Sequence, residues 1–392
     1  MEWMRWRFPH PSESSEREDA LQRIDAWWRT FAAVAPQLDD FFRRQGAQDD
    51  AQDLASWMRE HLGGIDEHIM WEFGPGTRGG DGHRLVLTPE GKHRLRPLVD
   101  AVLARAPGLV GWEFHAHRLA EVLPTALQTV VERTSVDLSG WRAHAEMSED
   151  GLVDVTLAPP ARVSPSAESR KAALLLVEVL VGEDLMDVWI GEVDVREGTN
   201  APMPLGELAA RVRALVQTWR ARIPPLPYFK RSSDASWMLL RLAPKTNAAP
   251  DYPGQQDMLV AKTLDFAMWR SQHGRRPFHS RRFSRSGEIM CTLKMDGADG
   301  LSPSGLADKA AIEDAITSAL APRGLGGQIG GGTGLRYSYV DLALTDVDAA
   351  METLRPVLRA GNLPKRTWLQ FFDADLADEW IPLWDDAPPP PR

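Results

Sequence analysis

The spacing of apolar residues changes along the chain and divides it into helical and strand-like stretches. From residue 20 to residue 62 the spacing is helical, because Leu21, Ile24 and Trp28 recur every three or four positions on one face. A glycine pair follows the second helical run, and glycine is common directly after a helix. We therefore expect a helical lead-in over residues 20–62.

Short strand-like runs alternate with amphipathic helices after this lead-in. The segments HIMWEFGPG and HRLVLTP predict a strand pair, and a helix that opens at Thr88–Pro89 leads to the strand segment GWEFHAHRL. A similar order, with a Leu-Arg-Pro helix and a Trp-led strand, returns between residues 354 and 371. We therefore expect ββαβ units in both halves of the chain.

A proline-rich segment separates the two halves. Pro224, Pro225 and Pro227 interrupt every periodicity there, so we place a linker at residues 223–235 between an N-terminal α+β domain, 1–222, and a C-terminal domain, 236–392. The second half reads βαββαβ, which is the order of a ferredoxin-like sandwich, and it ends in a proline-rich tail that we expect to be disordered. The predicted fold class is α+β, with antiparallel sheets and helices on one face.

A glycine-rich stretch, GLGGQIGGGTG at residues 324–334, is the segment most similar to a phosphate-binding loop. It lacks the lysine of a Walker loop, since Gly332 stands in that place, and it matches no dinucleotide-binding pattern. The residues that follow alternate with strand period, with Val340 and Leu342 on one side, whereas both phosphate motifs open a helix. We therefore expect a loop that joins two strands, and we expect no cofactor.

Composition indicates the compartment and the classes of partner. The chain of 392 residues carries a formal net charge of −10, which opposes general binding to nucleic acid or to an anionic membrane. It holds one cysteine, Cys291, within an apolar strand segment, and no apolar run long enough for a signal peptide or a membrane span. We therefore expect a cytoplasmic protein with a protein partner, no membrane association and no nucleic-acid partner.

An acidic stripe and an arginine-rich segment are the candidate binding features. The acidic stripe runs from Glu183 to Asp194, and no basic residue occurs between Lys171 and Arg196. The arginine-rich segment, RRPFHSRRFSR, spans residues 275–285. The stripe suits a basic protein partner or the protein's own arginines, and the arginine segment suits a single-stranded nucleic acid, an acidic peptide or an interdomain loop. The candidate binding residues are Glu183, Asp184, Asp187, Glu192, Asp194, Arg275, Arg276, Arg281 and Arg282.

Histidines on strand-like runs define an alternative, metal-dependent site. His115 and His117 are two residues apart and share a strand face with Glu113, and His144 lies on the polar face of another predicted strand. If the strands are neighbours, these side chains can form a three-histidine or a two-histidine-one-carboxylate metal site; otherwise they lie on a solvated sheet face. The alternative function is therefore a metal-dependent hydrolase.

The order of the segments resembles an uncharacterised bacterial family, a domain of unknown function. The matching stretches are WWRTFAAVAPQLDDFF, HRLVLTPEGKHRLRPLVDAVLARAPGLVGWEF, LLLVEVLVGEDLMDVWIGEVDV and DGLSPSGLADKAAIEDAITSALA. The resemblance implies ferredoxin-like α+β domains and a character similar to that of immunity proteins and of an inhibitor of ribonuclease activity, and it defines no catalytic residue. We therefore expect a non-enzymatic immunity or regulatory protein that masks a basic toxin or nuclease.

Overall fold

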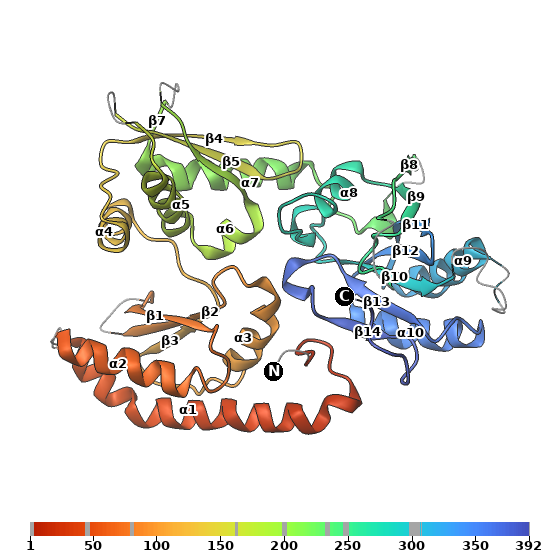
Figure 1. The fold of residues 1–392 in the computed structure, drawn as a ribbon, viewed down its shortest axis with the longest axis horizontal. Helices are drawn as coiled ribbons and strands as arrows, with labels where there is room; N and C mark the ends of the chain where they lie inside the picture. Colours follow the sequence, from red (N-terminus) through yellow and green to blue (C-terminus); the bar gives the residue numbers. More distant parts are fainter. Residues whose placement is uncertain are drawn as a thin grey trace. The chain divides into compact units, whose positions relative to one another are not determined.

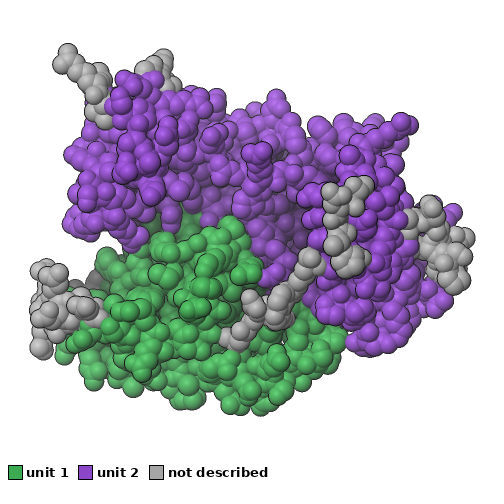
Figure 2. Space-filling model, viewed as in Figure 1, with its two compact units in different colours: residues 1–120, 182–184 green, residues 121–181, 185–392 purple. Residues whose placement is uncertain are grey.

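The structure is a computed structural model that describes residues 4–43, 48–78, 82–160, 164–197, 202–231, 236–245, 251–297, 306 and 308–391. The chain divides into two compact units, coloured separately in Figure 2. Unit 1 comprises residues 1–120 and 182–184, and unit 2 comprises residues 121–181 and 185–392. The linker predicted at residues 223–235 therefore falls inside unit 2, and its residues 232–235 lie outside the described part.

Unit 1 packs three helices and a small sheet around an aromatic core (Figure 1). Its elements are α1 (Ser14–Arg43), α2 (Gln48–His61), β1 (Met70–Pro75), β2 (His83–Thr88), α3 (Arg96–Leu103) and β3 (Trp112–His115). The sheet order is β1-β2-β3, with an antiparallel first pair and a parallel second pair joined by α3. Trp28 and Phe31 on the apolar face of α1 reach Phe114 and Trp112 on β3, with ring centroids 4.8 Å and 5.1 Å apart. The apolar face of α1 therefore packs into the core of unit 1, as the helical spacing over residues 20–62 predicts.

The first part of unit 2 is a four-stranded sheet with helices. Its elements are α4 (Leu123–Thr134), β4 (Arg142–Met147), β5 (Val153–Ala158), α5 (Ala167–Val181), β6 (Ile190–Val195), β7 (Met203–Pro204) and α7 (Leu208–Arg222). The strand order is β6-β5-β4-β7, and only β5 and β6 run parallel. Between α5 and β6 the chain forms α6 (Glu183–Trp189), whose first residues belong to unit 1.

The second part of unit 2 is a seven-stranded antiparallel sheet in the order β14-β13-β10-β12-β11-β9-β8 (Figure 1). Its elements are β8 (Met238–Arg241), β9 (Met258–Thr263), α8 (Phe266–Gln272), β10 (Ile289–Asp296), α9 (Lys309–Leu320), β11 (Gly326–Gly334), β12 (Tyr337–Leu344), α10 (Val347–Ala360), β13 (Thr367–Phe371) and β14 (Trp380–Pro382). From β10 to β13 the elements follow the order βαββαβ, and β14, β9 and β8 extend the sheet at its two edges. The predicted α+β class is confirmed.

The two parts of unit 2 contact each other. The Trp219 indole N–H of α7 donates to the backbone carbonyl of Arg282 over 2.9 Å. Arg270 of α8 forms an ion pair with Glu149, which follows β4, with 3.1 Å between Nη1 and Oε2. Among the described residues, no helix is long and apolar enough to cross a membrane.

The glycine-rich stretch is itself a strand, and this corrects the expectation of a loop. β11 pairs with β12 on one side and with β9 on the other, and the turn between β11 and β12 is Leu335–Arg336. The glycines leave space for other groups. A Cβ atom on Gly334 would lie 2.3 Å from a carboxylate oxygen of Asp257, and one on Gly330 would lie 2.9 Å from a carboxylate oxygen of Asp341. Buried carboxylates therefore exclude side chains at Gly330 and Gly334.

The end of the chain packs on the sheet, in contrast to the disordered tail that we expect from the sequence. The Trp368 indole N–H of β13 donates to the carbonyl of Pro388 over 2.6 Å. Pro390 is buried. Arg359 of α10 donates to the carbonyl of Leu383 over 2.9 Å and pairs with Asp385. The last described residues therefore belong to the packed structure of unit 2.

Gly334→Ala should destabilise unit 2 by about 2 kcal/mol, because overpacking a filled core typically costs about 1–3 kcal/mol. The added methyl group would meet the Asp257 carboxylate, which backbone bonds hold in place. Urea unfolding followed by circular dichroism measures the change.

Gly206→Ala is the matched control, because its Cβ would meet only Leu123 at an ordinary 3.6 Å. This variant should change the free energy of unfolding by less than about 0.5 kcal/mol. Equal effects of the two substitutions would contradict the account of the glycine strand.

Candidate functional site

Glu183, the first acidic residue of the predicted binding stripe, is buried and bonded to other residues of unit 1. Its side chain is 3% exposed, and its carboxylate accepts hydrogen bonds from the Thr88 hydroxyl, from Arg96 Nη2 over 2.9 Å and from the Arg118 backbone N–H over 2.9 Å. Burial raises the pKa of Glu183, but the bond from Thr88, the other hydrogen bonds and the Arg96 charge outweigh it and hold the pKa below its usual value. These bonds tie residues 182–184 to unit 1.

The other acidic residues of the stripe are divided between the two units. Asp184 lies in unit 1, where Oδ1 is 4.0 Å from His117 Nε2. Asp187, Glu192 and Asp194 belong to unit 2. Glu192 is exposed on β6, whereas Asp194 forms an ion pair with Arg196 at 2.7 Å. Part of the acidic charge is therefore paired with the protein's own basic side chains.

The arginine-rich segment 275–285 is partly exposed and partly internal. Arg275, Arg276 and Arg281 are exposed, but Arg282 is fully buried and donates from Nη2 to the Ser271 hydroxyl over 2.7 Å. Burial lowers the pKa of Arg282 to about 10. The buried arginine therefore fixes the segment to α8.

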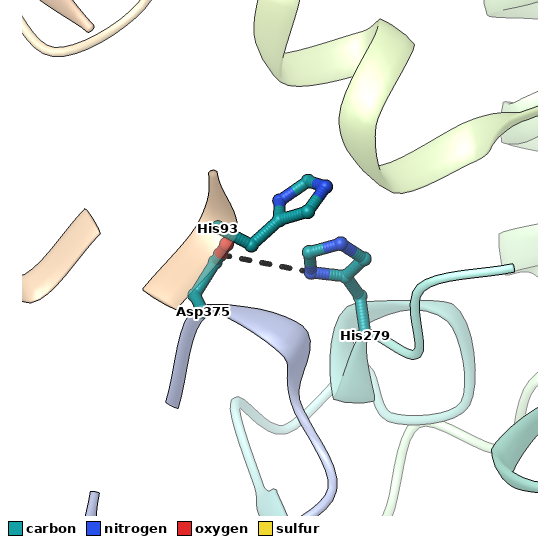
Figure 3. Close-up of side chains that lie close together, drawn as sticks. All are labelled: His93, His279 and Asp375. Atoms are coloured by element: carbon teal, nitrogen blue, oxygen red, sulfur yellow. Dashed lines mark ion pairs between the residues drawn. The ribbon is translucent and has the colours of Figure 1, made fainter. Parts of the chain in front are cut away.

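The segment contains a buried histidine, His279, that the sequence reasoning missed and that contacts an aspartate. His279 is buried, and its Nδ1 lies 3.7 Å from Asp375 Oδ2 (Figure 3). Next to it, the Ser280 backbone N–H donates to Asp373 over 2.8 Å, and burial raises the pKa of Asp373 to about 6. The residues between α8 and β10 thus contact the connection between β13 and β14.

The histidines of the predicted metal site are divided between the units. In unit 1, His115 Nε2 lies 3.3 Å from Glu113 Oε2, and hydrogen bonds, first that from Thr77, lower the pKa of Glu113 to about 2. In unit 2, His144 pairs with Glu146 at 3.6 Å. Among the described residues of unit 1, Glu113, His115 and His117 do not form a three-ligand cluster. The metal alternative stays a prediction.

A polar row crosses one face of the seven-stranded sheet, and the sequence reasoning did not identify it. Asp341 of β12 is in register with Thr292 of β10, Thr292 with Gln370 of β13, and Gln370 with Trp380 of β14. Residues opposite each other in an antiparallel pair place their side chains on the same face. The alternate residues, among them the predicted buried thiol Cys291, are apolar and buried on the other face.

A pocket of about 800 Å³ lies over this row. Thr292, Gln370 and Trp380 line it from the sheet, Gln255 from the loop before β9, and Gln272 from the end of α8. Gln255 Nε2 donates to Asp341 over 2.9 Å and to the Thr292 hydroxyl over 3.4 Å, and its carbonyl oxygen accepts from Gln272 over 3.0 Å. Gln255 therefore covers the buried carboxylate beneath the pocket.

Two buried charges lie below this pocket face. Burial raises the pKa of Asp341 to about 6, although hydrogen bonds from Thr292 and Gln255 oppose the shift. Burial lowers the pKa of Lys294 to about 8, and its ammonium group donates to the carbonyls of Tyr252 and Gly254. Groups with perturbed pKa values next to a pocket are typical of functional sites.

The outer strand β8 presents a second surface. It is the last strand of the sheet order, and no strand among the described residues pairs with its outer side. Leu239 is 73% exposed. The neighbouring exposed apolar residues are Trp237, Met238, Leu259 and Val260. An apolar edge strand of this kind is a ready template for pairing with another chain.

Comparisons of the sequence with protein-family models, with curated proteins and with solved structures find no match. The resemblance to a bacterial family of unknown function therefore stays a prediction.

Asp341→Asn should make the stability of the protein less dependent on pH. A carboxyl group whose pKa is raised to about 6 in the folded state stabilises the fold below its unfolded pKa of about 3.9, and this stability is lost as the pH rises through 6. Between pH 4 and pH 7 the wild-type free energy of unfolding should therefore fall by about 2 kcal/mol more than that of the variant. Urea unfolding at several pH values measures the difference.

Glu352→Gln, at an exposed position of α10, is the matched control and should keep the wild-type pH profile. If Asp341→Asn followed that profile too, Asp341 would not be a buried carboxyl group with a raised pKa.

Proposed function

We propose that the protein is a non-enzymatic binding protein, of the immunity or regulatory type and cytoplasmic, and that it binds an extended segment of another protein along β8. The observation that carries this proposal is the open edge of the seven-stranded sheet. Addition of a strand to such an edge is a common mode of peptide recognition, in which backbone bonds supply affinity and side chains supply specificity.

Backbone geometry supports this mode of binding. The N–H of Leu242 donates to the carbonyl of Leu259 over 2.8 Å and continues the ladder between β8 and β9. Hydrogen-bonded and non-hydrogen-bonded pairs alternate in an antiparallel ladder, so the N–H and C=O groups of Leu239 and Arg241 point away from β9. An incoming strand would pair with these two residues.

Side-chain charge favours a partner segment with acidic and apolar residues. Neither β8 nor β9 contains a carboxylate, and Arg241 is exposed beside Leu239. Opposite charges across a strand pair stabilise it, and like charges destabilise it. A second copy of the chain would place its own Arg241 near this Arg241, and the two positive charges would repel each other. An acidic segment would instead complement the charge of Arg241. The proposed partner segment is therefore opposite in charge to the basic partner expected from composition.

Two synthetic peptides test the proposal, one with alternating valine and glutamate and one with alternating valine and lysine. The full-length protein should bind the glutamate peptide at least tenfold more tightly, as measured by fluorescence anisotropy. Arg241→Glu should reverse this preference, because the cross-strand charge changes sign.

Leu239→Asp should abolish binding of the glutamate peptide, and Leu174→Asp, at an exposed leucine of α5, is the matched control that should leave it unchanged. Equal affinity for both peptides, or no binding of either, would contradict the proposal. A dimer in analytical ultracentrifugation that Leu239→Asp dissociates would instead place a second copy at the edge.

A further inference from the structure

We propose that the pocket over the polar row binds an uncharged, planar nitrogen heterocycle or aromatic amide, and that Gln370 recognises the edge of this ligand at which a hydrogen-bond donor stands next to an acceptor. The pocket lies on a face of the sheet, and it is separate in its residues from the β8 edge. This inference therefore does not rest on the proposed protein-binding function.

Gln370 is the group on the pocket floor that a ligand would satisfy. Gln370 is half-buried and lines the pocket, and its Oε1 atom is buried without a hydrogen-bond partner among the described residues. A buried polar atom without a partner is unfavourable by about 1–3 kcal/mol, so native proteins rarely contain one. A carboxamide offers an acceptor and a donor side by side, and it pairs with the complementary edge of a nucleobase or of another amide.

The other polar side chains of the floor are already engaged with one another. Gln255 donates to Asp341 and to Thr292 and accepts from Gln272. Asp341 also accepts a hydrogen bond from the Thr292 hydroxyl, and this bond opposes the rise in the pKa of Asp341. These contacts form a closed network under the pocket, so Gln370, which lies in register beside Thr292, is the position left for recognition.

The surroundings favour an uncharged ligand. The carboxylate of Asp341 is 4% exposed and lies beneath Gln255, and Lys294 is fully buried with its ammonium group on two backbone carbonyls. Charged residues also line the pocket, at Lys245, Asp378 and Glu379. At Gln370 a charged ligand would lose its hydration over two charges that are already bonded to protein groups, which is unfavourable.

The walls of the pocket favour a flat ring. Aromatic side chains line it from three elements, and the Trp269 ring carries the His273 ring stacked on it with centroids 4.4 Å apart. Prolines also line the pocket, and its volume of about 800 Å³ falls in the range of pockets that bind small molecules. The aromatic side chains on the pocket face are Trp269, His273, Phe372 and Trp380, whereas Phe371 alternates with Gln370 on β13.

Calorimetric titration of the full-length protein with uracil, cytosine, adenine and nicotinamide tests the inference. At least one of these probes should bind, and Gln370→Leu should weaken its binding at least tenfold. The urea midpoint of this variant should not be lowered, because the leucine removes an unpaired buried oxygen. Gln370→Glu, which keeps the shape but loses the donor, should weaken binding as well.

Gln217→Leu, at an exposed glutamine of α7, is the matched control and should bind like the wild type. Nicotinic acid and glucose separate the ligand classes, since the first carries a charge and the second is a polyhydroxy ring without an aromatic face. Failure of all four planar probes to bind, binding that Gln370→Leu leaves unchanged, or tighter binding of nicotinic acid or glucose would each overturn the inference.

Discussion

The buried carboxylate of Asp257 joins the outer part of the seven-stranded sheet to its centre. It is fully buried, and it accepts hydrogen bonds from the backbone N–H groups of Arg336 and Tyr337, each over 2.8 Å, and from the Tyr339 hydroxyl. Its backbone carbonyl accepts from the N–H of Leu335. A buried charge without these donors would be strongly unfavourable, so the chain before β9 is held at the turn between β11 and β12.

Both surfaces to which we assign a role follow from this arrangement. The residues before Asp257 form one wall of the pocket, and Lys294 below them bonds to the carbonyls of Tyr252 and Gly254. The residues after it form β9, which pairs with β11 and carries β8 at the open edge. The glycines of β11 make this possible, since a side chain at Gly334 would occupy the space of the Asp257 carboxylate.

Periodicity in the sequence predicts the α+β class, the helical lead-in and the βαββαβ order of the second half, because these depend on neighbouring residues. It fails at β11, where glycines offer no alternation of side chains to read. The return of residues 182–184 to unit 1 depends on the buried ion pair between Glu183 and Arg96, distant in sequence. The polar row is equally hidden, because Asp341, Thr292 and Gln370 come together only through strand register.

The most direct test of the central claim is amide hydrogen exchange, measured by NMR, in wild type and in Asp257→Asn. The substitution keeps the shape of the side chain but places an amide against the donors of the turn. The account predicts that the described amides of β8, β9 and residues 251–257 lose protection, while β10, β12 and β13 keep that of the wild type, as in a local unfolding unit. Unchanged protection in β8 and β9, or an equal loss over the whole sheet, would contradict the role of Asp257.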